Sequence, residues 1–363
     1  MRAIQLDTDC EGPLALNDNA FELCRDFLGP DGDRFFQQVS RYDDYLAGVV
    51  KKSGYKAGDT LKLILPFLKA HGVTNKMILE YSLKTIMLVP DAEAAYRFLH
   101  GFKFPIFEIS TSYRQFAEAV GIKLGFDPDH IFCTELDLDQ FKLRSIEAEE
   151  LHRLYWEIVA APEIELPGNA ASLADLPNLV QEAIRILDYI FWEKLPAMEI
   201  GAIYQEVNPI GGSEKAKAMS YSLEKTGLSR ADTIYVGDSI TDVEAFEAVR
   251  AHGGLAVSFN GNEYAVNSAE IIVASGTAWP IALLAIIFRH AGRQGVKEKI
   301  RTGVCSCDLS RMIYPQEQKI LEDALGGSQF IIYDSVTCDP GEALAKSKEM
   351  RAKLRGEAVA ALG

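Results

Sequence analysis

Two aspartates four residues apart are the most informative chemical feature of this chain. Residues 234–236 are β-branched or aromatic and predict a buried strand that Gly237 ends. Asp238 and Asp242 then follow on the turn that leads into a helix. Ligands of open α/β sheets bind beyond the carboxyl ends of the strands. Paired carboxylates at that edge are suited to hold a hard divalent cation through oxygen.

Other polar groups follow predicted strands in the same way, or lie on the helix just before such a strand. They are the acidic turn with Asp7, Asp9 and Glu11, the hydroxyl cluster Ser110, Thr111 and Ser112, and Lys215. Asn260, which follows a strand at 254–259, is a candidate for touching the substrate. Carboxylates as dense as those of the turn repel one another, so a simple turn does not account for them. We expect these groups to meet at one edge of the sheet.

The elements that would position these groups alternate between strands and helices. Strand patterns occur at residues 1–8, 105–109, 130–134, 233–236, 254–259 and 271–273. Helices with short connections separate most of them, which predicts a right-handed, mostly parallel sheet of the α/β class.

Helical patterns interrupt this alternation twice and divide the chain. The expected core comprises residues 1–13, 89–139 and 208–277. Residues 14–88 would form a helical cap, and residues 140–207 a second helical insertion. The C-terminal extension, 278–363, should contain helices at 279–293 and 340–355, an irregular stretch between them and a strand at 329–333, and we expect it to pack on the core or on a partner.

Composition limits the function classes. The formal net charge of −15 argues against binding to nucleic acid or anionic lipid, so an anionic substrate would need local positive charge or a metal. No segment reaches the length of apolar residues that a membrane span requires, and the start of the chain does not resemble a secretory leader. The six cysteines form no CxxC pair, which favours free thiols and a cytoplasmic location.

The order of these groups resembles the haloacid dehalogenase (HAD) superfamily, most of whose members are Mg²⁺-dependent phosphohydrolases. The best local match is the phosphoserine-phosphatase-like branch, where a lysine precedes the first aspartate of the last motif at a similar separation, here 238 − 215 = 23 residues. The match covers residues 1–12, 89–135 and 208–275. It implies a Rossmann-like three-layer core with caps inserted between the motifs.

The first motif of that superfamily, Asp-x-Asp, fits this chain in two registers. One begins at Asp7, with Asp9 as the second carboxylate. The other begins at Asp9 and places Glu11 second, followed by Gly12 and Pro13. We favour the second, since the Gly-Pro turn then falls where the chain leaves the strand. This register is similar to archaeal HAD proteins with Asp-x-Glu-Gly-Pro, sometimes labelled as a subunit of an energy-converting hydrogenase.

The resemblance implies a role for each group. Asp9 would attack phosphorus as the nucleophile, and Glu11 would act as acid and base, or Asp7 and Asp9 would share these roles in the other register. Ser110 and Lys215 would stabilise the phosphoryl group. The substrate would also contact Gly12, Thr111, Ser112 and Asn260. The Mg²⁺ ligands would come from Asp9, Glu11, Asp238 and Asp242, with Asp242 better suited to an orienting role.

The predicted function is therefore hydrolysis of a small phosphorylated metabolite. The extra methylene of Glu11 leaves two alternatives open. One is a HAD-type dehalogenase or phosphonate hydrolase. The other is a non-catalytic assembly subunit, hydrogenase-associated, whose C-terminal extension docks to a partner or to a second copy of the chain.

Overall fold

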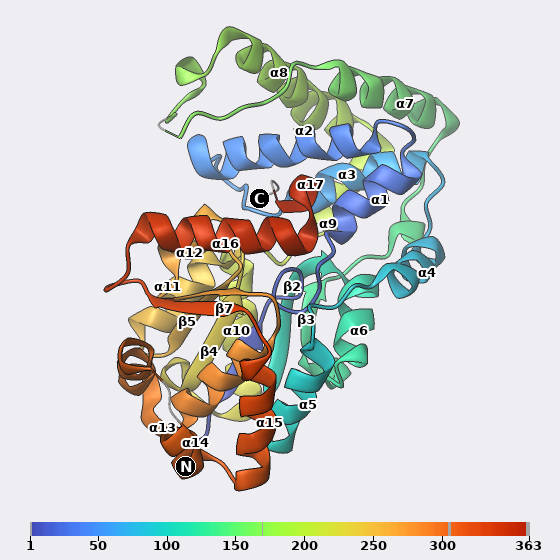
Figure 1. Cartoon of the computed structure of the whole chain (residues 1–363). Coiled ribbons are helices and arrows are strands. Elements are labelled where there is room, and N and C mark those ends of the chain that lie inside the picture. The colour runs from blue at the N-terminus through green and yellow to red at the C-terminus, as the bar shows by residue number, and fades with distance from the viewer. Residues whose placement is uncertain (1, 169, 304–305, 361–363) are drawn as a thin grey trace.

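The computed structural model describes residues 2–168, 170–303 and 306–360, and its centre is one sheet in the order β3-β2-β1-β4-β5-β6-β7 (Figure 1). All neighbouring strands are parallel except β6 and β7, which are antiparallel. This confirms the predicted mostly parallel α/β sheet. The strands are β1 (Gln5–Thr8), β2 (Ile106–Tyr113), β3 (Ile131–Thr134), β4 (Thr233–Gly237), β5 (Leu255–Phe259), β6 (Ile271–Ser275) and β7 (Phe330–Asp334).

Helices cover both faces of the sheet and complete three layers. Alternate side chains of the central strands pack on α5 (Ala92–Gly101), α6 (Arg114–Lys123) and α13 (Trp279–Thr302). The opposite face packs on α10 (Ser213–Thr226), α11 (Val243–Ala251) and α12 (Glu263–Ser268). Because side chains of a strand alternate between faces, each strand contributes to both cores.

The two helical insertions form one body above the carboxyl edge of the sheet (Figure 1). Their apolar side chains share a single hydrophobic core. The helices are α1 (Asn19–Phe27), α2 (Gly32–Asp44), α3 (Thr60–Ala70), α4 (Asn75–Thr85), α7 (Ser145–Ala160), α8 (Asn178–Tyr189) and the short α9 (Ile203–Glu206). Single π-helical turns, Tyr45–Val49 and Ile190–Lys194, extend α2 and α8. We call this body the helical cap.

The C-terminal extension packs on the same chain. Strand β7 adds an edge to the main sheet. The prediction of an irregular stretch before β7 is wrong. That segment contains α14 (Ser306–Met312) and α15 (Pro315–Gly326), and α15 begins with Pro315 at its first position. Helix α16 (Pro340–Arg355) runs between the sheet and the helical cap, followed by α17 (Glu357–Ala360) (Figure 1).

Two predictions from composition meet the structure here. Within the described residues every helix is too short or too polar to cross a bilayer. Cys10, Cys24, Cys133 and Cys338 are free thiols as predicted, but Cys307 is disulfide-bonded, which contradicts the expectation for that residue. Cys305 lies outside the described residues.

Candidate functional site

Two aspartates meet where neighbouring strands end. Asp9 directly follows β1 and Asp238 directly follows β4, and these strands are paired. The Asp9 N–H donates to the carbonyl of Val236 at 2.8 Å, which extends the pairing past the end of β1. Gly12 (φ +104°) then turns the chain so closely over Asp238 that an added Cβ would lie 2.2 Å from its Oδ2. Only glycine fits this approach without displacing the carboxylate.

The buried ammonium group of Lys215 forms an ion pair with Asp9. Lys215 is 0% exposed, and its Nζ lies 2.6 Å from Asp9 Oδ2 and 2.7 Å from Asp242 Oδ1. Burial lowers the pKa of Lys215, but the charges of Asp242 and Asp9 outweigh burial and raise the pKa above its ordinary value. Burial also raises the pKa of Asp9 to about 7; Lys215 opposes this shift, while Asp242 and Asp238 add to it.

Asp242 has an orienting role in this arrangement. Its Oδ1 accepts from Lys215 and from the Tyr235 hydroxyl, and its Oδ2 accepts from the backbone N–H groups of Asp238 and Ser239 at 2.9 and 3.0 Å. Both oxygens are therefore engaged by the protein itself. The contacts fix Lys215 and the turn that carries Asp238.

The carboxylates of this edge suit a divalent cation. Asp9, Asp238 and Asp242 each offer an oxygen, and these atoms lie within 4.8 Å of one another. All three residues are buried, and hard oxygen donors are the ligands that Mg²⁺ prefers. Each oxygen of Asp242 already has two donors. In Asp9, Oδ1 accepts from the Cys10 N–H and Oδ2 pairs with Lys215, one donor each. Asp9 and Asp238 are therefore better placed to bind the ion. Glu11 is not one of this group.

Glu11 lies in the same pocket, and both of its side-chain hydrogen bonds fall on one carboxyl oxygen. The backbone N–H of Asn19 and the hydroxyl of Ser112 donate to its Oε1 at 2.9 and 2.8 Å. Burial raises the pKa of Glu11 to about 8, helped by the charge of Asp18 and opposed by Arg355 and the two hydrogen bonds. A carboxyl with that pKa is protonated near neutral pH and can act as a general acid.

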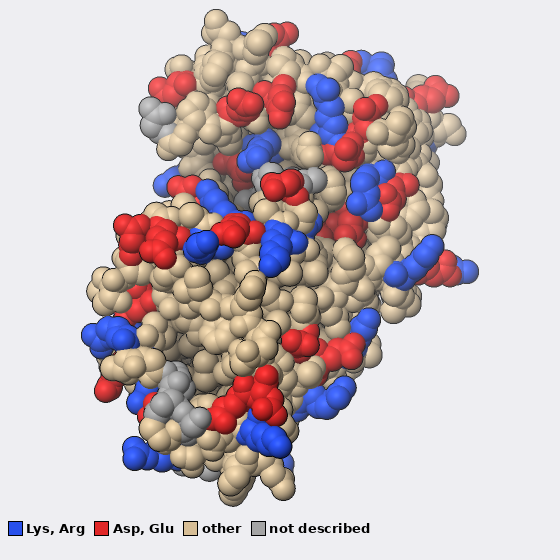
Figure 2. Space-filling model, viewed as in Figure 1, with Lys and Arg blue, Asp and Glu red and all other residues tan. Residues whose placement is uncertain are grey.

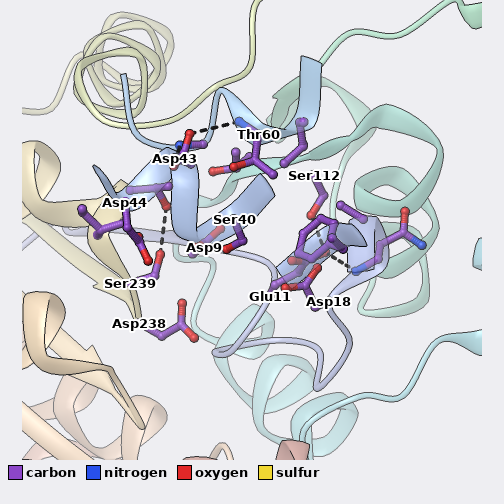
Figure 3. A pocket seen from close by; sticks show the side chains of 18 of the residues that line it. Asp9, Glu11, Asp18, Ser40, Asp43, Asp44, Thr60, Ser112, Asp238 and Ser239 are labelled. Carbon is purple, nitrogen blue, oxygen red and sulfur yellow. Dashed lines mark hydrogen bonds between the residues drawn. The ribbon is translucent and has the colours of Figure 1, made fainter. Parts of the chain in front are cut away.

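Asp9, Glu11 and Asp238 line a cavity of about 120 Å³ between the sheet and the helical cap, whereas Lys215 and Asp242 lie behind its wall (Figure 3). The helical cap contributes Ser40, Asp43 and Asp44 from α2, and Thr60 at the start of α3. The cap is close to the core here, because a Cβ added to Gly58 would lie 2.8 Å from the Thr111 methyl group. The site is therefore a small pocket covered by the cap.

Two arginines of α16 also line the cavity, and the sequence analysis did not single them out. Arg351 and Arg355 both donate through Nη1 to Oδ2 of Asp238, Arg355 at 3.0 Å. Arg351 is 4% exposed and Asp238 is 2% exposed, so this ion pair is shielded from water. A charged helix at 340–355 was expected, but its sequence pattern carries no signal for where it docks.

The charges on the face shown in Figure 2 do not mark a binding site. Basic and acidic side chains are intermixed there rather than gathered in one patch.

The other predicted site residues occupy different surroundings. Thr111 and Ser112 line the cavity, while Ser110 is buried and its Oγ accepts from the Ser112 N–H. Asn260 is bonded through its side chain to the backbone of Ser275 and does not line the cavity.

Asp7 also lies outside the cavity. It lies within β1, on the same face as Asp9 but two residues earlier, where Gln5 and Ser222 of α10 donate to its carboxyl at 2.8 and 3.1 Å. Asp7 is therefore surrounded by structural hydrogen bonds, and Asp9 is the first carboxylate of the turn to face the pocket.

Comparison with known proteins finds a relative that matches over the full length of the chain. No protein-family model matches the sequence, and no curated protein matches it. The structure of gene product AF1437 from Archaeoglobus fulgidus is 34% identical, covers 99% of both chains and superposes with a TM-score of 0.80. The chain belongs to the AF1437 family. A substrate-bound phosphoserine phosphatase complex is also similar, at 13% identity and TM-score 0.46, over 75% of this AF1437 family member and 93% of that chain.

Proposed function

We propose that this AF1437 family member is a Mg²⁺-dependent phosphohydrolase that cleaves a small phosphomonoester through an aspartyl-phosphate on Asp9. One observation carries the proposal. A carboxylate backed by a buried ammonium lies beside a second carboxylate, and a protonated glutamic acid reaches the same cavity. Phosphoryl transfer needs positioning and charge neutralisation, and these residues offer both.

In the first step Asp9 attacks phosphorus, which forms an aspartyl oxygen–phosphorus bond and breaks the bond to the leaving oxygen. Both hydrogen bonds to Glu11 fall on Oε1, so Oε2 is the oxygen that would give its proton to the leaving group. In the second step Glu11 takes a proton from water, and the water oxygen attacks phosphorus. The bond between phosphorus and the Asp9 oxygen breaks, which releases inorganic phosphate and restores the Asp9 carboxylate. Splitting the reaction lowers the barrier of each half.

The remaining residues bind and neutralise charge. Lys215 offsets the charge of Asp9 and of the phosphoryl group, and Asp242 holds Lys215 in place. The hydroxyl of Thr111, on the cavity wall, has no hydrogen-bond partner within the described residues and can donate to a phosphoryl oxygen. A Mg²⁺ ion held by Asp9 and Asp238 would supply Lewis-acid polarisation of the phosphoryl group. The small cavity favours a small substrate.

Hydrolysis of p-nitrophenyl phosphate and of a panel of alkyl phosphates, with Mg²⁺ or with EDTA, tests the proposal. We expect Mg²⁺-dependent phosphate release, and trapping of the acyl phosphate with hydroxylamine. Asp9→Asn should abolish both signals, whereas the matched control Asp7→Asn should preserve them. If the folded protein binds Mg²⁺ but releases no phosphate from any compound, the protein is not a phosphohydrolase and a non-catalytic role takes precedence.

A further inference from the structure

We propose that Arg351 and Arg355 form a phosphate-binding pair that couples the binding of substrate to the binding of the cation. In the structure both guanidinium groups pair with Asp238. When a divalent cation takes Asp238, the arginines transfer to the phosphate. The inference rests on the proposed function, because it concerns the ligands of the same site.

The first argument is the position of the two side chains. They lie one turn apart on α16, and both donate to one oxygen, Oδ2 of Asp238. The side chains of the arginines are 5% exposed and that of Asp238 is 3% exposed. Two shielded guanidinium groups on a single carboxylate oxygen leave more positive than negative charge in this ion cluster. A phosphate dianion would restore the balance.

The second argument is the charge of the cavity wall. Among its described lining residues, Arg351 and Arg355 are the cationic side chains, and the other ionisable groups are six carboxyls and the phenol of Tyr113. These carboxyls are Asp9, Glu11, Asp18, Asp43, Asp44 and Asp238. A phosphate group in this cavity has no other cationic side chain on the wall to contact. The planar guanidinium also matches phosphate oxygens through two parallel hydrogen bonds.

The third argument is competition. A divalent cation on Asp238 would stand beside two guanidinium groups that share its carboxylate, and like charges at such short range repel strongly. Binding of the cation alone must therefore break the two ion pairs with Asp238 and leave the arginines to the more distant carboxyls of the wall, such as Asp18. Binding of phosphate together with the cation gives them a partner. The two ligands should consequently bind more tightly together than separately, and by the same factor in either order.

Arg351 is the better position for a test. Arg355 also donates to the carbonyls of Leu16 and Asn17, which lead from the sheet into α1, at 3.0 and 2.6 Å. A change there would loosen the cap linker as well. Lys348→Gln provides a matched control, because it removes one positive charge from the exposed side of the same helix, where Lys348 contacts Glu263.

The experiment is calorimetric titration of Mg²⁺ into the full chain, with and without inorganic phosphate. For the wild type and Lys348→Gln, phosphate should tighten Mg²⁺ binding by about tenfold or more. Arg351→Gln should bind Mg²⁺ alone more tightly than the wild type and gain less than about twofold from phosphate. Weaker binding of Mg²⁺ alone by Arg351→Gln, or a phosphate effect as large as in the wild type, would overturn the proposal.

A second variant keeps the test decisive if Arg351→Gln does not fold. Arg351→Lys retains the charge but not the two parallel donors, so it should keep the weak binding of Mg²⁺ alone and lose part of the phosphate effect. Retention of the whole phosphate effect would contradict a guanidinium-specific role. Failure of the proposed function is a separate result: coupled binding of Mg²⁺ and phosphate without hydrolysis of any ester would reject the enzyme and leave the arginine pair in place.

Discussion

Replacement of Asp7 by asparagine tests both the energetics of the sheet and the identity of the nucleophile. Asp7 is fully buried in β1, and burial raises its pKa from 3.8 to about 8, although the hydrogen bonds from Gln5 and Ser222 oppose the shift. At neutral pH the folded protein therefore holds a proton on Asp7 that the unfolded chain releases. An asparagine side chain has nearly the shape of the carboxyl, is neutral like the protonated acid, and has an oxygen that can accept from Gln5, so Asp7→Asn imitates the folded, neutral state.

The magnitude follows from the two pKa values. Because the folded pKa lies above the unfolded one, the folded state binds more protons between these values, and the free energy of unfolding falls as pH rises. The slope is about 1.4 kcal/mol per pH unit while Asp7 stays protonated in the fold. Between about pH 6 and about pH 8 the loss is about 2 kcal/mol. Asp7→Asn does not titrate, so its stability relative to the wild type should rise by about that amount over the same interval.

Urea unfolding of both proteins at the two pH values measures this difference. Other groups titrate in both proteins, so subtraction isolates position 7. A difference that stays constant with pH would show that Asp7 is ionised in the folded protein, and the burial argument would be wrong. Activity gives the second readout: Asp7→Asn should keep kcat within about twofold of the wild type, whereas loss of the acyl phosphate in this variant alone would assign the nucleophile to Asp7.

Three further predictions concern the pocket. Lys215→Met should lower the free energy of unfolding by about 3–5 kcal/mol in urea denaturation, because it leaves buried carboxylates without their counter-charge, and Mg²⁺ should recover part of the loss. Gly12→Ala should weaken Mg²⁺ binding in calorimetry by about tenfold or more, since its Cβ would displace Asp238. With alkyl phosphates the rate should fall as pH rises through about 8, where Glu11 loses its proton, and p-nitrophenyl phosphate should not show this fall because its phenolate leaves unaided.

The sequence was sufficient for the sheet and for the residues that directly follow its strands. Each predicted strand has a counterpart in β1 to β7, because β-branched runs between turn residues are a local signal. Pairing of β1 with β4 then brings Asp9 beside Asp238 without further information. The end of β1 also separates the two registers of the first motif: Asp7 lies within the strand and Asp9 lies just beyond it.

Long-range packing could not be predicted in the same way. Two helical insertions were expected, at residues 14–88 and 140–207, without a prediction of how they pack. Their apolar side chains share one core, and no local pattern specifies such contacts. Residues between 293 and 329 contain Gly and Pro, and the tertiary structure nevertheless holds α14 and α15 there. Asn260 follows a strand as expected, but its side chain is used to bind the backbone of Ser275. A position at the carboxyl edge of the sheet therefore makes a residue a candidate for the site. Its hydrogen bonds in the folded protein show whether the side chain faces the cavity or binds the backbone.

The charge of the whole chain and the charge of the pocket place the same requirement on an anionic substrate. The net charge of −15 predicted that an anionic substrate would need local positive charge. At the scale of the cavity carboxyl groups again outnumber the two guanidinium groups of α16, although burial raises the pKa of several of these carboxyls and favours their protonated forms. A phosphate dianion entering alone would have to displace Asp238 from both arginines. A divalent cation at Asp9 and Asp238 would reverse the balance where the phosphorus must lie and would release Arg351 and Arg355 from Asp238. On the proposed function, the cation would therefore be a condition for substrate binding as well as for the chemical step.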